Sequence, residues 1–117
     1  MSVETELTTL LKTLCSRTFP DFAPLGTARP HVSYEAIGGR PLHWLDLTAT
    51  DKRHTVMQVR VWADTRQAAT ELMRSIESAM RAATVFTAWP QEEHTSLYDA
   101  ETSAYGSAQD FEIYSIR

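Results

Sequence analysis

The stretch that decides the fold of this chain is residues 54–83, HTVMQVRVWADTRQAATELMRSIESAMRAA. Its first ten residues place alternate side chains on opposite sides of an extended chain, which is the period-two pattern of a half-buried strand. One side carries Thr55, Met57, Val59 and Val61, and the other carries Val56, Gln58 and Arg60. We therefore predict a strand over residues 54–63.

An amphipathic helix follows this strand directly. The Asp64 carboxylate can accept hydrogen bonds from the free N–H groups of a first helical turn, and Gln67 completes a capping-box pattern three residues later. Apolar residues then recur at helical spacing, at Ala69, Leu72, Met73, Ile76, Ala79, Met80 and Ala83. This pattern predicts a helix over residues 65–82 that packs on a sheet.

The rest of the chain supplies another helix and the other strands. Leucines at i, i+3, i+4 and i+7 predict a first helix over residues 3–17, and they are Leu7, Leu10, Leu11 and Leu14. Alternating side chains between turn residues predict the strands at 31–37, 94–98 and 104–116, the last one most regular over 107–116. Residues 84–89 form a short extended piece, and residues 19–26 read as a connector whose two phenylalanines cap the edge of the core.

The order helix–strand–strand–helix–strand–strand predicts one α+β domain over residues 1–117. We expect a mainly antiparallel four-stranded sheet with both helices on one face, and a long hairpin arm between the first and second strands. The expected core residues are Leu10, Leu14, Val59, Val61, Leu72, Ile76 and Phe111.

The arm at residues 38–53 is longer and more apolar than a hairpin turn requires. Gly38 and Gly39 break the strand and give the backbone freedom to bend, and we expect the strand to resume near residues 42–47. The large apolar residues of the arm are Leu42, Trp44, Leu45 and Leu47. Because a lone domain rarely exposes such a patch, the arm is expected to contact a partner surface.

Composition excludes several classes of protein. The 117 residues contain 11 Lys and Arg against 15 Asp and Glu, a net charge of −4, which argues against broad binding to nucleic acid. Cys15 is the only cysteine, so neither an intrachain disulfide nor a cysteine metal cluster is expected. The sequence has no apolar run long enough for a membrane span and no signal-like leader, so we expect a soluble, intracellular protein.

No pattern of catalytic or metal-binding residues is present. The histidines lack metal-ligand spacing, and they are His31, His43, His54 and His94. No G-x-S-x-G nucleophile motif occurs, Gly38-Gly39 lacks the surroundings of a phosphate loop, and Glu92-Glu93 reads as a solvated loop. We therefore predict no catalytic, cofactor-binding or metal-binding residue, and no enzymatic activity.

Three motifs, in the right order, carry a resemblance to a known family. They are the arm PLHWLD at residues 41–46, the strand VMQVRVWADT at 56–65 with the helix after it, and the closing strand QDFEI at 109–113. Together they resemble the tail completion proteins of long-tailed bacteriophages, which are related to the tail terminators. The resemblance covers most of the chain, and the departure from it is the small, glycine-containing segment AYGSA at residues 104–108.

The resemblance implies a phage or prophage structural protein without catalysis. Such proteins form a ring, commonly a hexamer, that caps the major tail tube protein and meets the head-completion or connector protein. They are made in the host cytoplasm and end in the virion tail. An acidic balance suits a protein that surrounds passing DNA without binding it.

A ring needs two different complementary patches on each subunit, and the arm is a natural one. The expected interface residues are Arg40, Leu42, Trp44, Leu45 and Leu47. The alternative is a small monomeric binding module or toxin-like protein of the same fold, which would be separated from a ring by its size in solution and by a concave apolar pocket.

Overall fold

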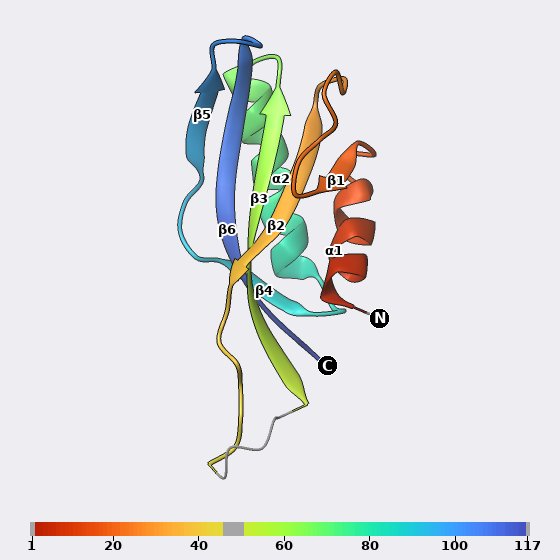
Figure 1. The fold of residues 1–117 in the computed structure, drawn as a ribbon, viewed down its shortest axis with the longest axis vertical. Helices are drawn as coiled ribbons and strands as arrows, with labels where there is room; N and C mark the ends of the chain where they lie inside the picture. The colour runs from red at the N-terminus through yellow and green to blue at the C-terminus, as the bar shows by residue number, and fades with distance from the viewer. Residues whose placement is uncertain (1, 46–50, 117) are drawn as a thin grey trace.

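A computed structural model describes residues 2–45 and 51–116. Its elements, in chain order, are α1 (Val3–Lys12), β1 (Thr18–Pro20), β2 (His31–Gly38), β3 (Lys52–Ala63), α2 (Arg66–Ala82), β4 (Thr87–Pro90), β5 (Thr95–Asp99) and β6 (Ala104–Ile116). All six strands belong to one sheet in the order β1-β2-β3-β6-β4, with β5 also paired to β6 (Figure 1). The pairing of β1 with β2 is parallel and the others are antiparallel.

The predicted strand and helix of residues 54–83 are confirmed as β3 and α2, and β3 is the centre of the sheet. It pairs with β2 on one side and, from Lys52 to Ala63, with β6 on the other. Met57, Val59 and Val61 are fully buried, while Arg60 between them is exposed. The alternation in the sequence of β3 therefore corresponds to the two faces of the sheet, one buried and one exposed.

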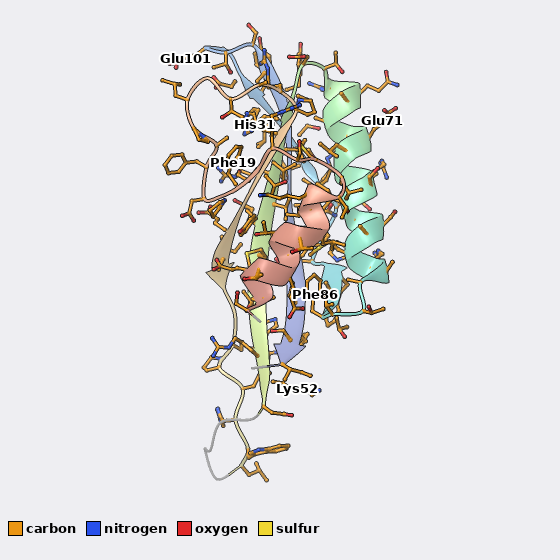
Figure 2. All side chains as sticks on the ribbon, turned by 90° about the vertical axis from the view of Figure 1, so that its right-hand side faces the viewer. Phe19, His31, Lys52, Glu71, Phe86 and Glu101 are labelled. Atoms are coloured by element: carbon orange, nitrogen blue, oxygen red, sulfur yellow. The ribbon has the colours of Figure 1, made fainter. Side chains whose placement is uncertain are left out.

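Both helices cover the same face. The register places Val32 and Tyr34 of β2 opposite Val61 and Val59 of β3, so these side chains share one face. That face forms a single core with Leu7 and Leu11 of α1 and with Met73, Ile76 and Met80 of α2. Figures 1 and 2 show the helices together on this side, leaving the other face of the sheet without a helix.

The predicted sheet is mainly antiparallel, as expected, but the number of strands is wrong, because the sheet of the described residues has six strands and not four. The two additional strands are β1 and β4, and β4 lies where we expected only a short extended piece. The short strand β1 lies parallel to β2 within the segment that we expected to be a connector. Three residues ending in a proline are too short to show a period, so the sequence pattern did not reveal it. Phe22 of this segment is 77% exposed and does not cap the core.

The first helix ends at Lys12, five residues before the predicted end. The Thr13 hydroxyl donates to the Leu10 carbonyl at 2.6 Å, and the chain then turns toward β1. Leu14 is consequently 37% exposed, while Cys15 is buried in the core. The expected core residues Leu10 and Leu72 are only partly buried, at the margin of the core.

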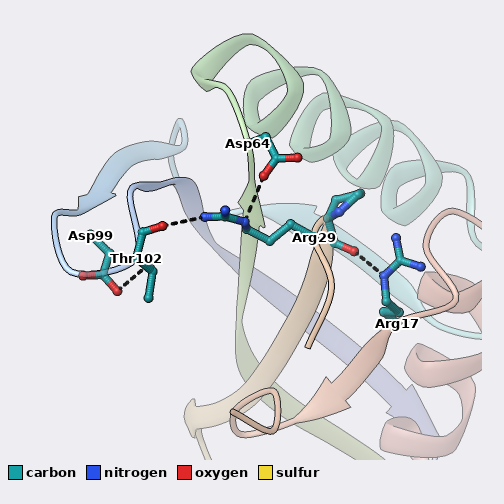
Figure 3. A network of polar contacts seen from close by, with 6 residues as sticks. Arg17, Arg29, Asp64, Asp99 and Thr102 are labelled. Carbon is teal, nitrogen blue, oxygen red and sulfur yellow. Dashed lines mark hydrogen bonds and ion pairs between the residues drawn. The ribbon is translucent and has the colours of Figure 1, made fainter. Parts of the chain in front are cut away.

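The cap of α2 is Thr65 rather than Asp64. The Thr65 hydroxyl accepts from the Ala68 N–H at 3.1 Å. Asp64 instead accepts from Arg29 Nε at 2.9 Å, and the same guanidinium donates to the Thr102 carbonyl at 3.1 Å (Figure 3). Arg29 thus ties the segment before β2 both to the end of β3 and to the β5–β6 turn.

The AYGSA segment has a physical explanation in Gly106. This residue pairs with Trp62 of β3, and a Cβ atom built on it would lie 2.8 Å from the Trp62 ring. A side chain at this position would displace the indole. The lack of a side chain at Gly106 in β6 therefore makes room for the Trp62 indole in β3. This fit defines the register of the closing strand.

Gln109 links three elements beneath α2. Its buried side-chain amide donates to the Glu77 carboxylate of α2 at 3.0 Å and to the Glu92 carbonyl, between β4 and β5, at 2.8 Å. The pKa of Glu77 is lowered chiefly by the Gln109 hydrogen bond, with further lowering by Arg81 and Arg74 and opposition from burial. Gln109 therefore holds the carboxylate in its charged form.

Replacing Val59 by Asp should unfold the protein. The carboxylate would lie in the core without a partner, and the expected loss is more than about 4 kcal/mol of unfolding free energy. Arg60→Asp is the matched control, because it places the same group one residue along on the exposed face of β3. Urea unfolding followed by circular dichroism measures both, and equal stabilities would contradict the assignment of faces.

Replacing Gln109 by Met should lower stability by about 1–3 kcal/mol at neutral pH, because the Glu92 carbonyl and the Glu77 carboxylate both lose the Gln109 donor. The pKa of Glu77, measured by NMR titration, should rise. Since the folded-state pKa of Glu77 lies below the unfolded-state value, near 4.5, the stabilisation is present above that pH and is lost as pH falls through the folded pKa. The difference in stability between the wild-type protein and the Gln109→Met variant should therefore shrink in acid. In a Glu77→Gln background, which cannot titrate at this position, the Gln109→Met effect should lose this dependence on pH.

Candidate functional site

The root of the arm, residues Gly39 and Arg40, is fixed to the start of β3 through His54. The Arg40 N–H donates to His54 Nδ1 at 3.0 Å, and His54 Nε2 lies 3.1 Å from Glu112 Oε1 of β6. Because the backbone N–H can only donate, Nδ1 is the acceptor, and Nε2 carries the proton that is donated to Glu112. The His54 side chain is only 4% exposed, so the imidazole is a buried link between arm and sheet.

The backbone at the root approaches β3 too closely for a side chain. Gly39 has a φ of 148°, and a Cβ atom built on it would lie 2.4 Å from the His54 carbonyl oxygen. Gly38 has a similar φ of 154° but nothing lies within 4 Å of its Cβ position. Both glycines allow the turn of the chain, and Gly39 alone also allows the contact with β3.

An aromatic row continues from His54 across the sheet face that has no helix. The His54 and Tyr114 ring centroids are 4.6 Å apart, and the Tyr114 and Trp89 centroids are 5.3 Å apart with nearly parallel planes. These residues come from β3, β6 and β4, and the register places them beside one another. The root of the arm therefore rests at one end of a row of packed aromatic rings.

The arm itself projects away from the helices and the sheet, as the yellow segment in Figure 1 shows. Leu42 is half-buried, whereas Trp44 is 61% exposed and Leu45 fully exposed. The Arg40 side chain is exposed beside the root, and Leu47 lies outside the described residues. No residue of 40–45 belongs to the core, so the described part of the domain is packed without the arm.

The described residues of the arm do not form the strand that we expected. We expected a strand to resume near residue 42, but among residues 39–45 only His43 has an isolated bridge. Strand β2 ends at Gly38, directly after the irregular register with β3 between Ala36 and Gly38. The rest of the expected strand, residues 46–47, lies outside the described residues.

The histidines lie apart and in different surroundings. The pKa of His31 is lowered by burial first, and then by the positive charges of Arg29 and Arg17. His94 Nδ1 lies 2.9 Å from the Ser107 hydroxyl, far along the sheet from His54. Over residues 2–45 and 51–116, no three side chains of His, Cys, Asp or Glu come together in a way that could hold a metal ion.

Within the same ranges, no helix is long and apolar enough to cross a membrane.

The exposed apolar side chains of the arm, Trp44 and Leu45, were expected from the sequence, but the contacts at its root were not. His54 was assigned to a polar strand face, because nothing in its local sequence shows that Gly39 and Glu112 lie on either side of it. The glycine pair was the available signal, since two glycines before an apolar segment indicate a close backbone approach as well as a bend.

Comparison with known proteins gives the same family as the three motifs. No individually curated protein matches the chain. The family model described as tail completion protein gp17 matches residues 2–115, a span that includes both helices, all six strands and the arm. The chain belongs to this family of phage tail completion proteins, which are structural components of the virion tail.

Proposed function

We propose that this protein forms a ring, with six subunits in the assembled tail, that caps the tail tube and joins it to the head connector. The observation that carries the proposal is the arm, which exposes Trp44 and Leu45 on a segment that the core does not need. Together with membership of the family, it supports a subunit whose apolar surface is covered only after assembly.

The geometry of the arm supports a head-to-tail contact. A ring requires one patch on each subunit to bind a different patch on the next. The arm leaves one end of an elongated molecule, whose principal extents are 52 × 25 × 22 Å, and it points away from its own helices. This direction supports a contact with a neighbouring subunit rather than with its own domain.

The charge of the chain supports a passive role toward DNA. A net charge of −4 gives no general attraction for phosphates. On the helix-free face, Glu35, Asp110 and Glu112 accompany Arg60, whose Nε donates to the Gln58 side chain at 3.0 Å. The DNA would pass through the ring without specific binding, and the protein would act without catalysis, first in the host cytoplasm and then in the virion.

Changing two exposed, large apolar side chains of the arm, Trp44→Ala with Leu45→Ser, should abolish ring formation and tail completion while leaving the fold intact. Since neither residue is in the core, the expected change in the thermal midpoint is only roughly 2–4 °C. Calorimetry measures the midpoint, and electron microscopy of tails from a complemented phage measures completion.

The control for this pair is Phe22→Ala with Leu25→Ser. These residues are also an aromatic and a leucine, 77% and fully exposed, but they lie in the segment between β1 and β2, where Leu25 lines a pocket with Thr102 of the β5–β6 turn. The control protein should complete tails normally. If the arm variant melts far lower, the arm belongs to the core, and if it folds and completes tails, the ring contact lies elsewhere.

The contact of Gly39 with β3 gives a second test of the arm. Gly39→Ala should impair tail completion more than Gly38→Ala, because both changes strain a positive φ but only Gly39→Ala also pushes the root away from His54. Completed phage particles are counted for each variant. Equal losses would show that the direction set by the Gly39 contact does not matter for assembly.

A further inference from the structure

A groove of about 440 Å³ runs between the two helices on the outer side of the domain. Its walls are stripes of residues one turn apart on each helix, and they include Glu6 and Leu10 of α1, Ala79, Ala82 and Ala83 on the side of α2, and the exposed Val85 after it. Small residues on the α2 side keep the groove open. Its surface is mainly apolar, so it suits an apolar side chain.

One of the residues that line this groove, Glu6, has a carboxylate oxygen without a hydrogen-bond partner in residues 2–45 and 51–116. Glu6 Oε2 is buried, and among the residues that the structure describes nothing forms a hydrogen bond with it. A buried carboxylate oxygen without a donor is costly, and an incoming cation with N–H groups would remove that cost. The groove therefore calls for a ligand that is apolar over most of its length and positively charged at one end.

We propose that the groove receives the arm of a neighbouring copy of this chain, with Trp44 against the apolar walls and Arg40 paired with Glu6. The inference rests on the proposed ring and names its second patch. The arm has the required order of side chains, a cation followed by Leu42, Trp44 and Leu45, and all of these but Leu42 are exposed.

The dimensions of the two partners agree. In an extended segment, residues 40, 42 and 44 point to the same side, and the Cα atoms of Arg40 and Trp44 lie about 13 Å apart. Along α1, Glu6 and Thr13 bound one wall of the groove, and seven residues of helix span about 10–11 Å. A long arginine side chain covers the remainder.

The direction of the arm makes the neighbour, and not the same subunit, the donor. Figure 1 shows the arm pointing away from both helices, and its root is held to β3 by the His54 contact. An arm that enters the groove of the next copy makes a head-to-tail contact, which repeats around a closed ring.

Filling the groove should therefore prevent assembly. Ala82→Arg adds a long side chain at an exposed helix position that borders the groove, and it should lower the yield of completed phage by about tenfold or more. Ser75→Arg is the matched control, because it adds the same side chain to an exposed position of α2 outside the groove. Circular dichroism verifies that both proteins fold.

The predicted ion pair gives a test specific to the arm. Glu6→Arg alone and Arg40→Glu alone should each lower the yield, and the doubly exchanged protein should recover most of it. A cysteine pair, Leu42→Cys on the side of the arm that faces the groove with Ala82→Cys in its wall, should give a ladder of disulfide-linked subunits when oxidised tails are run on a non-reducing gel. Each single variant should give none, because the native Cys15 is buried.

The outcomes separate this inference from the proposed function. If Ala82→Arg completes tails, or if completed tails carrying the cysteine pair give no ladder, the groove is not the second patch, and the ring proposal stands. If the wild-type protein is not found in tails, the proposed function itself fails. A failure of the doubly exchanged protein beside a clear ladder would overturn the ion pair.

Discussion

The fold depends on the burial of one face of β3 between its two neighbours and the helices. Met57, Val59 and Val61 are fully buried, and in this part of the strand β2 pairs on one side and β6 on the other. Each of these side chains contributes roughly 1.5–3 kcal/mol when removed from water, and the period of two fixes which face receives the helices. A slip of one residue would bring Arg60 into the core, so the register is strongly specified.

The elements with a long and regular pattern could be predicted from the sequence, and those set by distant contacts could not. The unit β3–α2 has two clear periods in succession. The strand β1 has too few residues for a period, and its pairing depends on where the segment after α1 meets β2. At the cap of α2, Asp64 and Thr65 are both good capping residues, and the local sequence does not show that Asp64 pairs with Arg29 while Thr65 caps the helix.

The same division holds at the candidate site. The exposure of Trp44 and Leu45 could be predicted, because the arm is apolar and the two helices and the sheet already supply the core. The root of the arm depends on a buried imidazole that meets Gly39 on one side and Glu112 on the other, residues far apart in the sequence. The helix groove combines residues from α1 and from the end of α2. None of these neighbours can be inferred before the strands and helices are placed relative to one another.

Because the core is complete without the described part of the arm, the residues that stabilise the domain differ from those that reach beyond it. Substitutions at the tip of the arm are therefore nearly free of any folding penalty, and selection can act on them for fit to a partner alone. Related phages could in this way diverge in partner choice while the scaffold stays constant. Subunits from two such phages in one cell would then fold equally well and still sort into separate assemblies.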